Sequence, residues 1–323
     1  MEKFNLFKMF SPKPINKDDE YNEAPTDFKG FFVMLGRKFW NLSNLNLLFV
    51  VCNFPIFFYL YTLTGQLSNQ IYAVGNPLYP AYYGMITISK SPELLSLAPF
   101  VSRFVPMYVP TTACRVFQYI SLLAVFTIAL TSVGSAYVIR GYNRGDPIFM
   151  VSDFFGAIKR NWKQGLIVGI MDIVISFLLV WDFIFWNAQS GFANAMFYYA
   201  SLFLGIIYFF MRYYIYTLLI TFNLSIPKIF KNAFIFAFLG LKRNLFALVG
   251  VALVLFINVQ LFYMLPVLGI LLPLVITFSL CNFITGYASY PVIKKYMIDP
   301  YYSDNDGEND EGSNEGSVFV DRG

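Results

Sequence analysis

Long apolar stretches, separated by shorter polar connections, dominate the pattern of the chain. Six of them reach about 20 residues or more, and a helix of that length crosses a hydrocarbon core of roughly 30 Å. Because backbone groups in lipid must be satisfied within the segment, helices are the expected form. The pattern therefore predicts an all-α, polytopic membrane protein with six transmembrane helices. The expected spans are roughly Phe39–Leu63, Cys114–Ile139, Gly165–Asn187, Ala195–Phe222, Leu245–Leu265 and Gly269–Val292.

A second pattern recurs before the first, third and fifth spans. A short segment with apolar residues at helical spacing is followed by basic residues, a nearby asparagine and then the span. Three cytoplasmic interfacial amphipathic helices, each leading into a transmembrane hairpin, would build the six-helix body. The alternative is that any membrane entry gathers aromatic and basic residues. Before the third span, Ser152 is the expected N-cap, and the expected apolar face holds Phe154, Phe155, Ile158 and Trp162.

Composition supports a membrane protein and excludes several kinds of chemistry. Apolar residues make up 57% of the 323 residues and charged residues only 13%, about half the share of a soluble domain. The chain has no histidine, which excludes Ser-His-Asp catalysis and histidine-ligated zinc or haem. The three cysteines have no CxxC spacing and are expected to be small buried hydrophobes. We therefore expect no cofactor, no metal site and no enzyme activity.

The charges lie in separate blocks and predict the orientation of the chain. Of the 23 Lys and Arg residues, nineteen fall in one alternating set of ends and connections, three fall in the opposite set, and Arg212 lies inside a span. Cytoplasmic connections carry the excess of Lys and Arg, so both termini are expected in the cytoplasm. The basic clusters flank spans and form no separate domain, so the expected partner is the lipid bilayer and not nucleic acid.

The polar parts divide the chain further. We expect a cytoplasmic N-terminal segment over 1–26, a membrane domain over 27–298 and a disordered acidic cytoplasmic tail over 299–323. Within the membrane domain, the connection 64–113 is rich in Tyr and Pro and is expected outside the cytoplasm. Loops this long are functional or disordered, and so many aromatic residues favour order. The sequence leaves open whether this connection is an ordered cap or an insertion.

One stretch of about a tenth of the chain carries a family resemblance. The segment TSVGSAYVIRGYNRGDPIFMVSDFFGAIKRNWKQ, over Thr131–Gln164, resembles the YesL-like family of bacterial membrane proteins, a domain of unknown function. The opening of the first span, NLNLLFVVCNFP, is similar to that family too. The resemblance implies a bacterial plasma-membrane protein, often associated with carbohydrate uptake, although the long Tyr/Pro connection departs from the family's usual short one. The residues that match the family motif are Arg140, Arg144, Asp153, Phe154, Asn161, Trp162, Lys163 and Gln164.

Ionisable residues inside spans are costly, and by default they are functional or paired. Asp172 and Asp182 lie in the third span and Arg212 in the fourth, with the turn between the spans expected near Gly191. In antiparallel helices that rise about 1.5 Å per residue, Asp172 and Arg212 reach nearly the same depth. We therefore expect them to form an intramembrane ion pair. Its role, gating or holding two helices in register, stays open; Asp182 is expected to be a hydrated interfacial carboxylate.

Small and polar residues in the other spans predict close packing more than a substrate path. Gly165 and Gly169 form a GxxxG pair, and polar side chains can hydrogen-bond between helices. Pro266 and Pro273 are expected to punctuate the outer turn of a hairpin. The polar residues concerned are Asn258, Gln260 and Asn282, and the row of small residues is Cys281, Thr285 and Ser289.

Three functions compete on these grounds. The first is an accessory or assembly subunit that acts with a carbohydrate importer complex, as the resemblance implies. The second is a stand-alone oligomeric transporter or channel for a small solute. The third, an intramembrane enzyme, lacks any nucleophile–base constellation in the sequence. A homo-oligomer stays open in each case. A path for a solute would have to use Asp172, Arg212, Asn258, Gln260 and Asn282.

Overall fold

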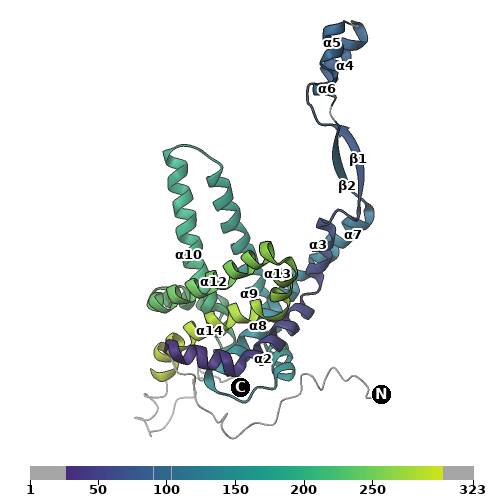
Figure 1. The fold of residues 1–323 in the computed structure, drawn as a ribbon. Coiled ribbons are helices and arrows are strands. Elements are labelled where there is room, and N and C mark those ends of the chain that lie inside the picture. Colours follow the sequence, from purple (N-terminus) through teal and green to yellow (C-terminus); the bar gives the residue numbers. More distant parts are fainter. Residues whose placement is uncertain (1–26, 90, 103, 301–323) are drawn as a thin grey trace, which may run out of the picture. The chain divides into compact units, whose positions relative to one another are not determined.

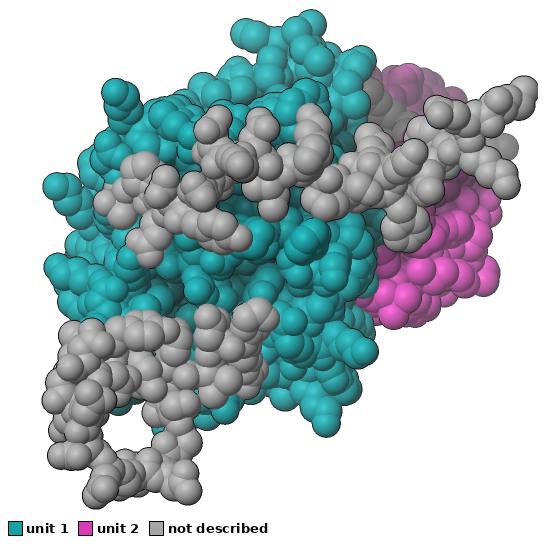
Figure 2. Space-filling model, turned by 90° about the horizontal axis from the view of Figure 1, so that it is seen from below, with its two compact units in different colours: residues 1–53, 125–323 teal, residues 54–124 magenta. Residues whose placement is uncertain are grey.

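The computed structural model describes residues 27–89, 91–102 and 104–300, and most of them are helical (Figure 1). The expected N-terminal segment 1–26 and the tail beyond residue 300 lie outside these residues. The chain divides into two compact units, residues 1–53 with 125–323, and residues 54–124 (Figure 2).

Among the described residues, five helices are long and apolar enough to cross a membrane, and a sixth span results if the bent pair α2 and α3 crosses it together. The predicted fold class, an all-α polytopic membrane protein, is therefore confirmed. The elements are α2 (Phe28–Cys52), α3 (Pro55–Leu63), α7 (Thr112–Ser121), α8 (Leu123–Arg144), α9 (Met150–Asn187), α10 (Phe192–Thr221), α11 (Ile226–Leu239), α12 (Leu241–Met264), α13 (Pro266–Leu272), a π-helical turn (Pro273–Thr277), α14 (Phe278–Ile293) and a second π-helical turn (Lys294–Ile298).

Helices α9 and α10 pack side by side as a hairpin (Figure 1). The turn between them ends at Gly191, whose φ of 113° is a conformation that glycine adopts at little cost. The Gly191 carbonyl then accepts from the Ala195 amide at 3.0 Å in the first turn of α10. The turn lies where the sequence predicted it, and this position sets which residues of the two helices share a level.

The structure joins the expected interfacial segments to their spans in two different ways. Before the fifth span, α11 is a separate helix that begins next to Pro227 and ends at Gly240. Before the third span, the segment and the span form one continuous helix of 38 residues. The break before the fifth span lies at Gly240, which is both the C-cap of α11 and the N-cap of α12.

The predicted details at the start of α9 were partly wrong. The N-cap is Phe149 and not Ser152, and the Phe149 amide donates to Oδ2 of Asp153 in the first turn at 2.7 Å. Phe154 is fully buried, whereas Phe155 and Trp162 are about half exposed. The buried face therefore follows Phe154, Ala157, Asn161 and Gly165, which is the spacing of a single helix stripe.

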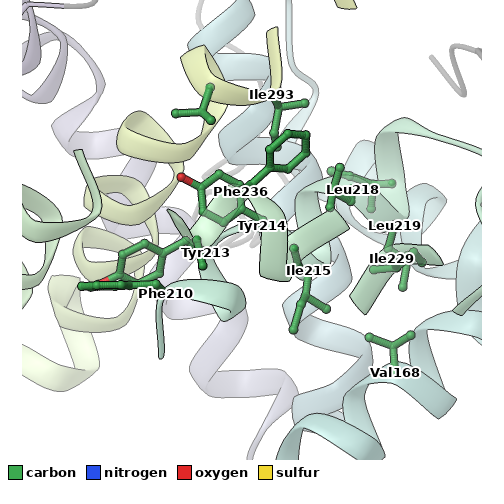
Figure 3. Packing of buried hydrophobic residues seen from close by; sticks show 14 of the residues in the cluster. Val168, Phe210, Tyr213, Tyr214, Ile215, Leu218, Leu219, Ile229, Phe236 and Ile293 are labelled. Carbon is green, nitrogen blue, oxygen red and sulfur yellow. The ribbon is translucent and has the colours of Figure 1, made fainter. Parts of the chain in front are cut away.

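The largest buried cluster lies where α10 meets α11 and α14. The rings of Tyr214 and Phe236 lie next to each other in Figure 3, with centroids 5.6 Å apart. The Tyr214 hydroxyl donates to Asn244 Oδ1 at 2.7 Å, so this buried polar group is satisfied. A second cluster joins α2, α8, α9 and α14 through Leu45, Val138, Phe154 and Phe283, among others.

The smaller unit, residues 54–124, contains the whole of the predicted connection 64–113. Strands β1 (Ser68–Val74) and β2 (Phe104–Pro110) pair antiparallel from Ser68↔Pro110 to Val74↔Phe104. This sheet is a departure from the all-helical prediction. Both strands are edge strands, so prolines within β2 are tolerated. Between the strands lie three short helices, α4 (Tyr79–Ile88), α5 (Pro92–Ser96) and α6 (Ala98–Val101).

Candidate functional site

Asp172 on α9 forms the centre of a buried polar cluster. Its Oδ1 lies 2.8 Å from Arg212 Nε and accepts from the Tyr208 hydroxyl at 2.9 Å. Its Oδ2 accepts from the Tyr216 hydroxyl at 2.9 Å. The two residues that the depth argument paired therefore do lie together. Three donors from α10 therefore surround this buried carboxylate.

One face of α10 supplies all three donors. Tyr208, Arg212 and Tyr216 are four residues apart in sequence, and side chains at this spacing stack along one side of a helix. The sequence analysis found Arg212 because it is charged and did not single out the two tyrosines. Their spacing from Arg212 was the signal that could have identified them.

A second carboxylate joins the same two helices nearer to their turn. Asp182 accepts from Trp186 Nε1 at 2.8 Å within α9 and from the Ser201 hydroxyl of α10. Ser201 is buried and Asp182 is half-buried. The prediction of a hydrated interfacial carboxylate omitted this link, because Ser201 carries no charge to mark it. The α9–α10 pair is therefore connected by carboxylates at two levels.

A cavity of about 210 Å³ lies between α8, α10, α12 and α14. Arg212 reaches it from the Asp172 cluster, and its side chain is 43% exposed while that of Asp172 is buried. The wall combines aromatic and aliphatic side chains with several polar ones. The principal polar residues of the wall are Arg140, Asn143, Arg212, Tyr213, Asn282 and Thr285.

Residues of the family motif lie around the C-terminal ends of α8 and α10 and the N-terminal part of α9. Arg140 is buried, and its Nη1 donates to Thr221 Oγ1 at 3.1 Å. Gln164 Nε2 donates to the Leu224 carbonyl at 2.5 Å. These contacts tie α8 and α9 to the end of α10.

The remaining motif residues serve local structure. Arg144 Nε lies 3.3 Å from Asp146 Oδ2 in the connection to α9. Lys163 Nζ lies 5.6 Å from the centre of the exposed Trp162 ring, and the buried Asn161 donates to the Ala157 carbonyl at 3.1 Å. The motif therefore describes a packed junction, in which only Arg140 also reaches the cavity.

Glycines set the distance between α8 and α9. A Cβ atom on Gly169 would lie 2.3 Å from Ala129 Cβ, and one on Gly165 would lie 2.7 Å from Val133 Cγ2. A Cβ on Gly134 would meet the ring of Phe154 at 2.7 Å. The GxxxG pair therefore marks close helix packing, as the sequence predicted.

The structure places the three other polar residues that the sequence singled out, Asn258, Gln260 and Asn282, in different surroundings. Asn258 accepts from Thr277 Oγ1 at 3.2 Å and so joins α12 to the turn before α14. Gln260 is exposed on α12. Asn282 lines the cavity together with Cys281 and Thr285, two residues that the sequence assigned to packing.

The sequence analysis missed Asn46 on α2. Asn46 is buried, and its Nδ2 donates to the carbonyls of Pro273 at 2.9 Å and Leu274 at 2.8 Å. Its Oδ1 accepts from the Ser279 amide at 3.0 Å. A side chain thus satisfies backbone groups of the π-helical turn, where the regular ladder is disturbed. Pro273 begins this turn and Pro266 begins α13.

Metal-ligating groups are sparse in the part of the chain that the structure describes. Within it, no three Cys, Asp or Glu side chains gather as metal ligands do. Cys52, Cys114 and Cys281 are free thiols, and Cys114 is buried.

Comparison with known proteins leads to one family. No curated protein and no solved structure matches the chain. Residues 33–183 match the family described as "Protein of unknown function, DUF624". The match covers most of α2, the smaller unit, α8 and most of α9, including every residue of the motif. The chain is therefore similar to the DUF624 family over residues 33–183, and the resemblance to the YesL-like family is consistent with this match.

Proposed function

We propose that the protein is an accessory or assembly subunit of the bacterial plasma membrane, which acts with a carbohydrate importer and has no enzyme activity of its own. Both termini face the cytoplasm in this proposal, and the unit 54–124 lies outside. The family resemblance supports the choice of a carbohydrate importer as the partner. The exposed apolar surface of the unit 54–124 is the observation that carries the proposal.

This surface belongs to the helices between β1 and β2. Ile88 is 90% exposed and Phe100 is 76% exposed, and Leu78 is also well exposed. Glu93 is the one charged residue among the described residues of this segment, 75–89 and 91–102. Exposed apolar patches of this kind mark interaction surfaces, and a membrane protein partner offers a matching apolar face.

The Asp172 cluster supports the same function in a different way. Both carboxylate oxygens are occupied by donors from α10, so the cluster holds α9 and α10 in register. An ion pair that fixes two helices of the chain stabilises the fold to which a partner would bind. A gate, in contrast, needs an ion pair that can open.

Co-purification tests the proposal. The full chain is extracted in mild detergent as wild type, as the double variant Ile88→Ser/Phe100→Ser, and as Thr87→Ala, a matched polar control on α4. We expect a stoichiometric importer component with wild type and Thr87→Ala, and its loss with the double variant. A clean homo-oligomer that moves a solute in liposomes would contradict the proposal.

That contrary result would favour the second candidate, a stand-alone oligomeric transporter or channel for a small solute. The cavity beside Arg212 is the observation that supports it. Its polar wall and its position between four helices are features of solute sites in bundles.

A further inference from the structure

Polar atoms without partners gather at the cavity wall. Asn143 on α8 is only 2% exposed, and neither its Nδ2 nor its Oδ1 has a hydrogen-bond partner among the described residues. The buried hydroxyl of Tyr213 on α10 is also unpartnered within the described chain. Leaving such groups unsatisfied is costly, and both residues line the cavity. The wall therefore offers donors and an acceptor that a polar occupant can satisfy.

Arg212 adds a fixed charged donor to these groups. Its Nε is held at 2.8 Å by Asp172, which orients the guanidinium. In the part of the chain that is described, the two terminal amino groups make no hydrogen bond, and the side chain is 43% exposed at the cavity. A guanidinium presented in this way matches the geometry of a carboxylate or a phosphate.

Charge and size narrow the kind of occupant. The described wall contains two guanidinium groups, those of Arg140 and Arg212, and no carboxylate. The volume of about 210 Å³ is well above the roughly 10–15 Å³ that a single buried water needs. It is smaller than the roughly 300–1,000 Å³ of sites for drug-sized ligands. The occupant is therefore small, rich in oxygen and negatively charged.

We propose that this cavity is a binding site for a small oxyanion, a phosphate or carboxylate group, held by Arg212, Tyr213 and Asn143. The terminal amino groups of Arg212, the Tyr213 hydroxyl and Asn143 Nδ2 donate to its oxygens. Asn143 Oδ1 accepts from a hydroxyl on the ligand. A free anion and the headgroup of an anionic lipid share this chemistry.

Thermal unfolding of the purified full chain in detergent tests the proposal, with inorganic phosphate and acetate as probes. Sodium chloride at equal ionic strength and glucose are the comparisons. We expect phosphate or acetate to raise the unfolding temperature progressively with concentration, as binding to the folded state requires, while chloride and glucose have no such effect. Equal stabilisation by chloride or glucose, or none by either probe or by anionic lipid, would overturn the site.

Two variants and one control test whether the stabilisation by anions comes from binding in this cavity. Asn143→Leu and Tyr213→Phe each remove unpartnered groups, so both are expected to fold without loss of stability and to weaken anion binding about tenfold. Ser135→Ala is the matched control, because it removes another buried, unpartnered hydroxyl of α8 that does not line the cavity. A phosphate response that Asn143→Leu and Tyr213→Phe leave unchanged would place the anion elsewhere and refute the proposal.

A further experiment with lipids distinguishes a free anion from the headgroup of an anionic lipid. The chain is placed in nanodiscs of phosphatidylcholine alone or with phosphatidylglycerol. A response to inorganic phosphate in phosphatidylcholine supports a free anion. Stabilisation by phosphatidylglycerol that is lost in Asn143→Leu and kept in Ser135→Ala supports a lipid headgroup.

Discussion

Two helix pairs of the larger unit pack side by side but are held together by different chemistry. Between α9 and α10, Asp172 and Asp182 accept hydrogen bonds across the pair at two levels, and Arg212 adds an ion pair. Between α12 and the turn that leads into α14, a neutral hydrogen bond runs from the Thr277 hydroxyl to Asn258 Oδ1. Helices in lipid gain little from burying apolar surface against each other. The comparison therefore indicates that α9–α10 is fixed by charge, whereas α12–α14 relies on packing.

Removing the charge of Arg212 should have the largest effect. Arg212→Leu leaves the buried Asp172 carboxylate with only its two tyrosine donors, and breaking a buried pair in this way costs about 3–5 kcal/mol. Unfolding of the purified protein by denaturing detergent measures the loss. The double variant Asp172→Asn/Arg212→Leu should regain part of it, because the unpaired charge is gone. An unshifted transition in Arg212→Leu would mean that the pair does not stabilise the hairpin.

Enlarging Gly169 tests packing on the other face of α9. In Gly169→Ala the new Cβ would lie 2.6 Å from Ala129 Cα, so the backbones of α8 and α9 must separate. Overpacking of this kind costs about 1–3 kcal/mol. Gly205→Ala on α10 is the matched control, because a Cβ there has no described atom within 4 Å. The same unfolding assay should leave the control as stable as wild type; similar losses in both variants would point to helix propensity and not to contact.

Removing one donor of the Asp172 cluster should have a smaller effect. Tyr208→Phe deletes the hydroxyl that donates to Asp172 Oδ1 at 2.9 Å, while Arg212 and Tyr216 remain. We expect a loss of about 1 kcal/mol in the free energy of unfolding, since hydrogen bonds between membrane helices contribute about 0.6–2 kcal/mol. Tyr213→Phe on the same helix removes an unpartnered hydroxyl and should cost nothing. A larger loss in Tyr213→Phe than in Tyr208→Phe would reverse the assignment.

The neutral contact of α12 should matter least. Asn258→Leu removes the acceptor of the Thr277 hydroxyl, whose bond is 3.2 Å long, and is expected to cost about 0.6 kcal/mol. The measurement is the same detergent-induced unfolding transition. A loss as large as that of Arg212→Leu would remove the distinction between the two helix pairs.

The sequence placed Asp172 and Arg212 at the same depth for a simple physical reason. A charge inside an apolar run needs a partner, and the constant rise of a helix converts sequence distance from Gly191 into depth. The sequence analysis missed Tyr208, Tyr216 and Asn143 because an uncharged tyrosine or asparagine can lie in a span without a charged partner. Whether it meets a carboxylate, a backbone group or a cavity depends on the rotation and position of neighbouring helices.

The sequence by itself determined that this is an all-α membrane protein, because runs of about 20 apolar residues with few charges have no stable alternative to spanning helices. It also determined which two charges meet and which glycines bring helices close. The tertiary structure alone decided that α9 runs unbroken through its entry segment, that the connection 64–113 contains a two-stranded sheet, and that α8, α10, α12 and α14 enclose a polar cavity. These features depend on contacts between residues far apart in the chain, and hydrophobic periodicity does not report such contacts.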